Sequence, residues 1–211
     1  MKIIKAIIII TLPIIIVLLN LWLLAFDFGW YQSEFAKLGV YQRLEPQKVL
    51  AQTGNLFAYL QGKQILTASY YTEREIAHLT DVKNLVTAAK TALTVFAAIF
   101  IAALLWLLKK EEAKKTIKFI FWAGVFCFGF YLLKAVFFFF FFDRIFLLFH
   151  QLAFINDFWR LDPQTEFLIV IFPPDLFADL AKRIIIYSLA GAGLLAAISG
   201  LYLLRLKNKT R

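Results

Sequence analysis

Four long apolar runs constrain this chain more than any other feature of its sequence. The first, residues 3–26, is almost unbroken and follows Lys2 and Lys5. A secretory signal has an apolar core of roughly 7–15 residues and a cleavage site made of small residues. This run is longer and lacks such a site. It therefore predicts a retained transmembrane helix, with a kink at Pro13.

Three further runs have the length of about 20 apolar residues that a bilayer requires. They are predicted at 85–108, 116–142 and 184–206. The hydrophobic fraction of 62% and the mean hydropathy of +0.74 are typical of integral membrane proteins. We therefore expect an all-α, polytopic membrane protein. It would be a four-transmembrane-helix bundle that forms one membrane domain over residues 1–211.

Two long segments, 27–84 and 143–183, and a short charged loop, 109–115, connect the predicted spans. In the first long segment, Pro46 is a favoured first helical residue. The helix is expected to reach Leu60 and to end at Gly62, as part of a helical cap. Thr72 and Glu75 have the spacing of a capping box. The helix that they start would run toward the second span, and its length would allow a break near residues 83–84.

The segment 143–175 is mostly apolar, yet polar residues recur in it at short intervals. That composition is typical of a re-entrant or interfacial segment that lines a site at membrane depth. Within it, Asp162-Pro163 is expected to form the N-cap and first residue of a helix. In the last span, Ser188, Ala192, Ala196 and Gly200 recur every fourth residue, a spacing that lets a neighbouring helix approach closely.

The distribution of charge predicts the orientation of the chain. The amino end, residues 109–118 and the tail carry eleven of the 23 Lys and Arg residues, against two Glu. The remaining residues carry twelve of each sign, so the whole net charge of +9 lies on one side. Because basic residues favour the cytoplasmic side, both termini are expected inside and both long segments outside. The basic clusters are thereby explained without nucleic-acid binding.

The only two histidines, His78 and His150, both fall in the segments that we expect outside. Glu75 and Asp81 lie three residues on either side of His78. Asp157 follows His150 by seven residues, about two turns along one face if a helix persists there. Two imidazoles with carboxylates suit general acid–base catalysis of acyl transfer, or a metal site. The closely spaced HxxH and HExxH patterns are absent, so no metal or other cofactor is predicted.

Other residues in the same region have both structural and functional interpretations. Each histidine is also compatible with a purely structural role beside an apolar wall. Arg144 and Arg160 suit a phosphate or carboxylate, or ion pairs with neighbouring aspartates. Trp159 suits packing at the interface or contact with a substrate. The single cysteine, Cys127, lies inside a span, and no GxSxG motif is present, which argues against a covalent nucleophile.

Two motifs resemble those of the lipoprotein intramolecular transacylase (Lit) family of bacterial membrane proteins. The first is Glu75-Ile-Ala-His78-Leu-Thr-Asp81-Val82. The second runs from His150-Gln-Leu-Ala-Phe through Asn156-Asp157-Phe-Trp159 and Leu161-Asp162-Pro163 to Phe172-Pro173. Two positions depart from the expected pattern. Glu166 stands where aspartate is expected after Thr165, and Pro174-Asp175 stands where glutamate is expected after Pro173.

The resemblance implies an enzyme of the bacterial cytoplasmic membrane whose active site lies at the extracytoplasmic face. Its substrate would be a diacylated lipoprotein, whose sn-2 acyl chain moves to the α-amine of the terminal cysteine to give the lyso form. His78 and His150 would be the catalytic pair. Glu75, Asp81, Asp157, Trp159 and Arg160 are the candidates for substrate-binding or supporting roles. The alternatives left open are a metal-dependent membrane hydrolase, another lipid acyltransferase, and a non-enzymatic scaffold.

Overall fold

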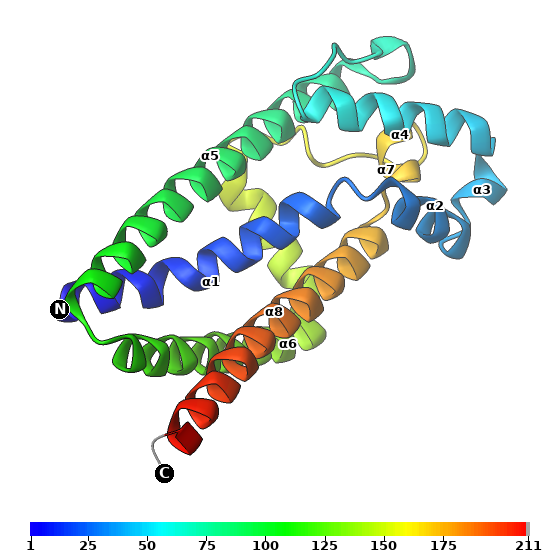
Figure 1. Ribbon diagram of the computed structural model, residues 1–211. Helices are drawn as coiled ribbons and strands as arrows, with labels where there is room; N and C mark the ends of the chain where they lie inside the picture. Colours follow the sequence, from blue (N-terminus) through cyan, green and yellow to red (C-terminus); the bar gives the residue numbers. More distant parts are fainter. Residues whose placement is uncertain (210–211) are drawn as a thin grey trace. The chain divides into compact units, whose positions relative to one another are not determined.

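The computed structural model describes residues 1–209, which form helices and loops without a strand (Figure 1). The elements are α1 (Lys2–Leu24), α2 (Phe28–Lys37), α3 (Val40–Arg43), α4 (Pro46–Leu60), the 3-10 turn η1 (Ala68–Tyr70), α5 (Glu73–Lys110), α6 (Ala113–Ala153), α7 (Phe167–Ile171) and α8 (Pro174–Lys209).

Within the described residues, α1, α5, α6 and α8 are long and apolar enough to cross a membrane. The predicted all-α fold with four membrane-spanning helices is therefore confirmed. The exact ends of each span within these helices stay predictions. The last charge of the predicted cytoplasmic tail, Arg211, lies outside the described residues.

The helices contribute to two compact units, each with its own core. The first unit contains residues 1–22, 91–140 and the described residues from 182 onward. Its α6 and α8 pack closely, because a Cβ added at Gly124 would lie 3.0 Å from the backbone nitrogen of Ala196. Ser188 and Ala192 are fully buried. The small residues of α8 therefore permit the close helix approach that their spacing predicts.

The second unit contains residues 23–90 and 141–181. In its core, Phe35 of α2 and Val49 of α4 are fully buried together with Leu176 of α8. The helix predicted from Pro46 to Leu60 is confirmed as α4. It ends as expected at Gly62, whose φ of 75° is accessible to glycine at little cost. The N–H groups of Gly62 and Lys63 then bond back to the last turn of the helix.

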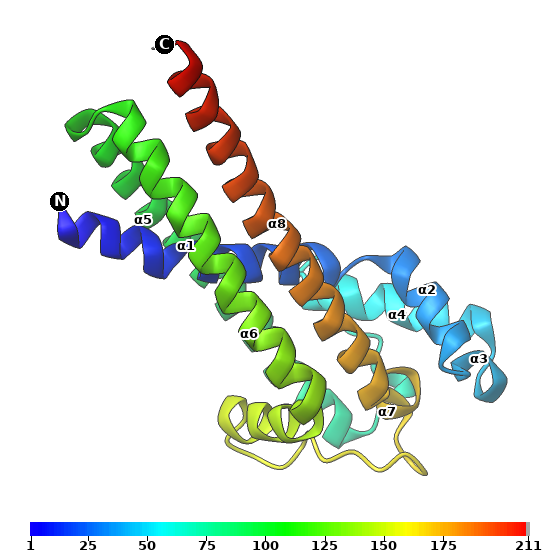
Figure 2. The same cartoon turned by 90° about the horizontal axis from the view of Figure 1, so that it is seen from below.

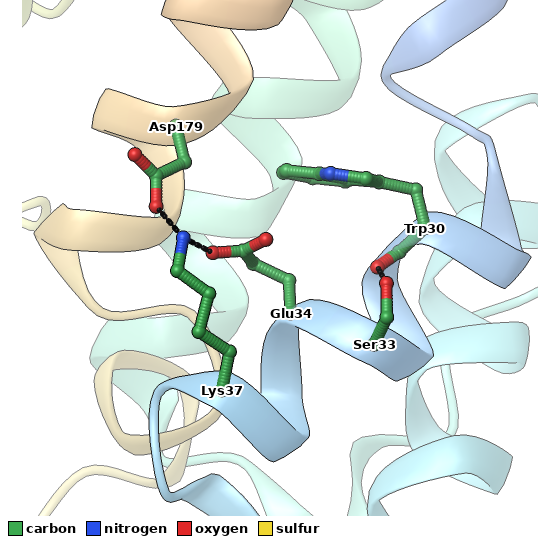
Figure 3. Close-up of polar contacts among 5 residues, drawn as sticks. All are labelled: Trp30, Ser33, Glu34, Lys37 and Asp179. Atoms are coloured by element: carbon green, nitrogen blue, oxygen red, sulfur yellow. Dashed lines mark hydrogen bonds and ion pairs between the residues drawn. The ribbon is translucent and has the colours of Figure 1, made fainter.

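Lys37 fastens α2 to the beginning of α8 within this second unit (Figure 3). Its ammonium lies 2.7 Å from Glu34 Oε1 and 2.5 Å from Asp179 Oδ2. Hydrogen bonds to these two carboxylates raise the pKa of Lys37 to about 12. Because the lysine is largely exposed, solvent screens the pair and its contribution to stability is small.

Two local interpretations of the sequence are wrong. No break interrupts α5 near residues 83–84, since the helix is continuous from Glu73 to Lys110. Asp162-Pro163 does not start a helix. Instead the Asp162 carboxylate accepts the N–H of Gln164 and its carbonyl accepts that of Glu166, so the segment is a turn and α7 begins only at Phe167. The helix α6, drawn in Figure 2, contains the predicted span 116–142 and runs on to Ala153. The backbone of Phe141 inside it is non-helical.

Candidate active site

The two histidines come from different helices and lie close together in the second unit. His78 is in the second turn of α5, and His150 is in the last turn of α6. Their ring centroids are 6.4 Å apart, and the ring planes are inclined by 32°. His78 is 8% exposed, whereas His150 is partly exposed. The fold therefore brings together two imidazoles that are 72 positions apart in the chain.

Aromatic side chains surround the histidine pair. Phe154 packs against both rings, with centroids 5.1 Å from His78 and 5.6 Å from His150. Phe146 and Trp159 contact His150 at 4.4 Å and 5.0 Å. These rings exclude water and lower the local dielectric, which strengthens every electrostatic interaction of the two imidazoles.

The hydrogen bonds of the two rings differ. His150 Nδ1 lies 2.7 Å from the carbonyl oxygen of Phe146, one turn earlier in α6. A carbonyl only accepts, so Nδ1 carries the hydrogen and Nε2 keeps its lone pair. His78 Nδ1 is buried and has no hydrogen-bond partner in the described part of the chain.

The surroundings of His78 keep its ring neutral. His78 precedes the predicted span 85–108, and its pKa is lowered to about 4. Burial is the main cause, and the nearby His150 adds to it, while the carboxylate of Asp81 acts in the opposite direction. At neutral pH the His78 imidazole is therefore uncharged and can donate one N–H.

The loop between α6 and α7 is hydrogen-bonded to the first turns of α5. Asn156 Nδ2 donates to Asp81 Oδ2 at 2.8 Å, and Arg74 donates to the carbonyl of Arg160 at 3.0 Å. Because α5 carries His78 and α6 ends three residues after His150, these bonds help to hold the two rings in place.

A second group of bonds joins the start of α5 to α7 through two buried carboxylates. Glu75 is fully buried and accepts the N–H of Thr72 at 2.6 Å and that of Leu168 at 2.5 Å. The Thr72 hydroxyl accepts the N–H of Glu75 and donates to Glu166, which also accepts the N–H of Asp162. The predicted capping box is thus confirmed, and Glu75 additionally caps α7.

The remaining predicted site residues lie along the same loop. Trp159 packs against His150 with the two ring planes tilted by 40°, and the Arg160 guanidinium lies 5.0 Å from the Trp159 ring. Asp157 pairs with Arg160 at 3.0 Å, and both side chains are largely exposed. The helix that would align Asp157 with His150 along one face does not persist, because α6 ends at Ala153.

Some residues of the site were not among the predicted candidates. Phe154, Asn156 and Glu166 all lie inside the second motif, and Phe146 precedes it by four residues. The spacing of four between Phe146, His150 and Phe154 was the available signal, since residues at i and i+4 of a helix are neighbours. Within residues 1–209, no three His, Cys, Asp or Glu side chains form a group suited to a metal ion.

The fold and this site define a multi-pass membrane protein with a histidine pair in an aromatic enclosure. A family model described as lipoprotein intramolecular transacylase Lit matches residues 6–177. The chain belongs to this family. It is therefore an acyltransferase of the intramolecular transacylase type.

Solved structures share the fold of this chain. One is an in meso structure of the membrane integral lipoprotein intramolecular transacylase Lit from Bacillus cereus. It has a TM-score of 0.85 and 21% sequence identity, and the match covers 99% of this chain and 97% of that chain. A histidine-to-arginine variant of the same protein gives a TM-score of 0.81 at 20% identity, covering 100% of this chain and 94% of that one. No curated protein matches the chain in a sequence search.

Proposed function

We propose that this chain moves the sn-2 acyl chain of an S-diacylglyceryl cysteine, at the amino terminus of a bacterial lipoprotein, to the α-amine of the same cysteine. The product is the lyso form of the lipoprotein. The name of the family supports a lipoprotein substrate. The observation that carries the proposal is the 6.4 Å separation of the His78 and His150 rings, which provides two proton-handling groups at one place.

The reaction requires such a pair. The amine nitrogen attacks the ester carbonyl through a ring of N, Cα, Cβ, S, two glycerol carbons, the ester oxygen and the carbonyl carbon. As the C–N bond forms and the C–O bond breaks, the nitrogen loses a proton and the glycerol oxygen gains one. Medium-sized rings form reluctantly, so holding the headgroup in a folded conformation contributes several kcal/mol to lowering the barrier.

The geometry favours different roles for the two histidines. His150 acts as the general base, since its Nδ1–H is engaged with Phe146 and its Nε2 lone pair is available. His78 stays neutral because burial lowers its pKa to about 4. As a neutral imidazole it donates an N–H to the developing oxyanion or to the departing glycerol oxygen. Arg160 is a second candidate donor.

The other predicted site residues support this pair without taking part in proton transfer. Trp159 packs on His150 and fixes the side of the ring that faces the substrate. Glu75 positions the first turn of α5 relative to α7. Asp157 holds Arg160 by an ion pair.

We place the protein in the bacterial cytoplasmic membrane, with spans at 3–26, 85–108, 116–142 and 184–206. Both termini would be cytoplasmic and the histidine pair would lie at the extracytoplasmic face. Lys5 of α1 pairs with Glu111 at 2.8 Å, which supports a common side for the amino end and the short charged loop. Acyl chains of the substrate would then lie among the membrane lipids while its headgroup reaches the histidines.

Mass spectrometry of lipoproteins tests the proposal in a bacterial host that makes only the diacyl form. Expression of the chain should yield lyso-lipoprotein. His78→Asn and His150→Asn should each abolish the conversion while the protein remains in the membrane. Asparagine at position 150 retains an N–H that can bond to Phe146 but lacks the equivalent of Nε2. Full conversion by both variants would remove the histidine mechanism, and loss of wild-type activity to a chelator would favour a metal-dependent reaction.

A further inference from the structure

A pocket lies beside the histidine pair, between α5 and the loop that follows α6. Its volume is about 380 Å³, within the range of roughly 300–1,000 Å³ that is usual for small-molecule sites. All of its lining residues belong to the second unit. Phe154 lines the pocket and also packs against both histidine rings, so the pocket adjoins the proposed reaction centre.

The pocket continues the face of α5 that carries His78. Asp81, Leu85 and Ala88 line it, and they follow His78 at intervals of three, four and three residues. That spacing keeps side chains on one face of an α-helix. A molecule in the pocket therefore lies along the same face of α5 as the His78 imidazole.

The polar groups that line the pocket are the Asp81 carboxylate and the carboxamides of Asn84 and Asn156. Asp81 lies one turn after His78 on the same helix. Asp81 Oδ2 accepts the bond from Asn156, and Oδ1 is the other oxygen available for a cation. The Asn84 side chain is exposed, so its carboxamide can bind a ligand without breaking a structural bond. A carboxylate beside an amide is suited to an ammonium group next to a peptide carbonyl.

Apolar residues line the rest of the pocket, including Leu85 and Ala88 of α5 and Phe154. The predicted second span begins at residue 85, so Leu85 and Ala88 would lie where the helix enters the lipid. A lining that combines polar and apolar residues matches an amphiphile with a charged head and a hydrocarbon part. The volume suits the headgroup of such a molecule rather than two full acyl chains.

We propose that this pocket binds the terminal cysteine of the lipoprotein, with Asp81 holding the α-ammonium group and Asn84 the first peptide carbonyl. The inference rests on the proposed function and adds how the enzyme recognises its substrate. Asp81 selects substrates with a free amine, which the acyl transfer consumes. Asn84 selects an amine that belongs to a peptide. The bound headgroup then places the nitrogen next to the His78 and His150 rings. The ammonium first releases one proton to water, and the amine so formed loses its second proton as the C–N bond forms.

Binding of unreactive ether-linked analogues tests the assignment. The three probes are an S-dialkylglyceryl cysteinyl peptide with a free amine, the same peptide with an acetylated amine, and S-dialkylglyceryl cysteamine, which has an amine but no peptide carbonyl. Kd is measured for the full-length protein in detergent. A hydrogen bond to a charged group contributes about 1.5–3 kcal/mol, so the wild type should bind the free amine at least about tenfold more tightly than the acetylated probe.

Two substitutions test the predicted contacts of Asp81 and Asn84 separately. Asp81→Asn keeps an oxygen for the bond from Asn156 but removes the charge. It should abolish the preference for the free amine and leave the Kd of the acetylated probe within about twofold to threefold of the wild-type value. Asn84→Ala should keep the preference for the amine but lose the advantage of the peptide over cysteamine. Thr87→Ala is the matched control, because Thr87 is exposed on the same helix and does not line the pocket.

The outcomes separate this inference from the proposed function. If wild type binds free and acetylated amines equally, or if Asp81→Asn keeps the preference, the assignment of the pocket is overturned, even when lyso-lipoprotein is still formed. Asn84→Ala could instead change the preference for acyl-chain length and leave the affinity difference between the peptide and the cysteamine probe as in the wild type. That result would make the pocket an acyl-chain site. If the wild-type protein prefers the free amine in the binding assay but forms no lyso-lipoprotein, the proposed function is overturned and the pocket assignment stands.

Discussion

Replacing Glu75 by glutamine should destabilise the protein, because this buried carboxylate accepts two backbone N–H groups. One comes from Thr72 at 2.6 Å and the other from Leu168 at 2.5 Å. Glutamine has the same size, but only one of its two terminal atoms accepts. One N–H therefore loses its acceptor in a fully buried position, which costs about 1.5–3 kcal/mol.

Thermal unfolding of the purified protein in detergent measures this effect. For a chain of about this size, 1 kcal/mol corresponds to roughly 2–4 °C in Tm, so Glu75→Gln should lower Tm by about 3–12 °C. Glu73→Gln is the matched control. Glu73 is exposed in the first turn of the same helix, and its neutralisation removes only a favourable interaction with the helix dipole, below about 1 kcal/mol.

Limited proteolysis provides a second readout, because Glu75 is bonded to the backbone of α7. Cleavage within residues 154–166 should become faster in Glu75→Gln than in Glu73→Gln. An unchanged Tm for Glu75→Gln, combined with loss of acyl transfer, would refute the reasoning and place the carboxylate in the chemistry itself.

Two further measurements test other parts of the structure. With only two histidines, labelled imidazoles give two sets of NMR signals. The His78 signal should remain that of a neutral ring until the pH falls to about 4. His150→Gln should raise the pKa of His78, because it removes the nearby imidazole that lowers this pKa, and Asp81→Asn should lower it further. Opposite shifts would contradict the described surroundings of His78. In the first unit, Gly124→Ala forces a Cβ to within 3.0 Å of the α8 backbone, and should cost about 1–3 kcal/mol in thermal unfolding. Gly129→Ala, where no atom lies within 4 Å, should be neutral or slightly stabilising, and equal effects of the two substitutions would contradict the close helix approach.

Two predictions of helix ends from local sequence are confirmed. The capping box of Thr72 and Glu75 and the termination of α4 at Gly62 both depend on residues within a few positions of each other. The prediction that Asp162-Pro163 starts a helix also depended on adjacent residues, and it is wrong. There the Asp162 carboxylate and carbonyl accept N–H groups inside a turn, an arrangement that competes with helix formation.

The sequence by itself determined the membrane class, the four spanning helices and the family, because hydrophobic length and short motifs are properties of contiguous residues. It also indicated His78 and His150 as candidates. Only the tertiary structure decided that their rings lie 6.4 Å apart, that Phe154 packs between the pair and a pocket, and that Glu75 binds the backbone of Leu168. Such contacts join residues more than 70 positions apart. They depend on how helices pack, and no local pattern in the chain encodes that packing.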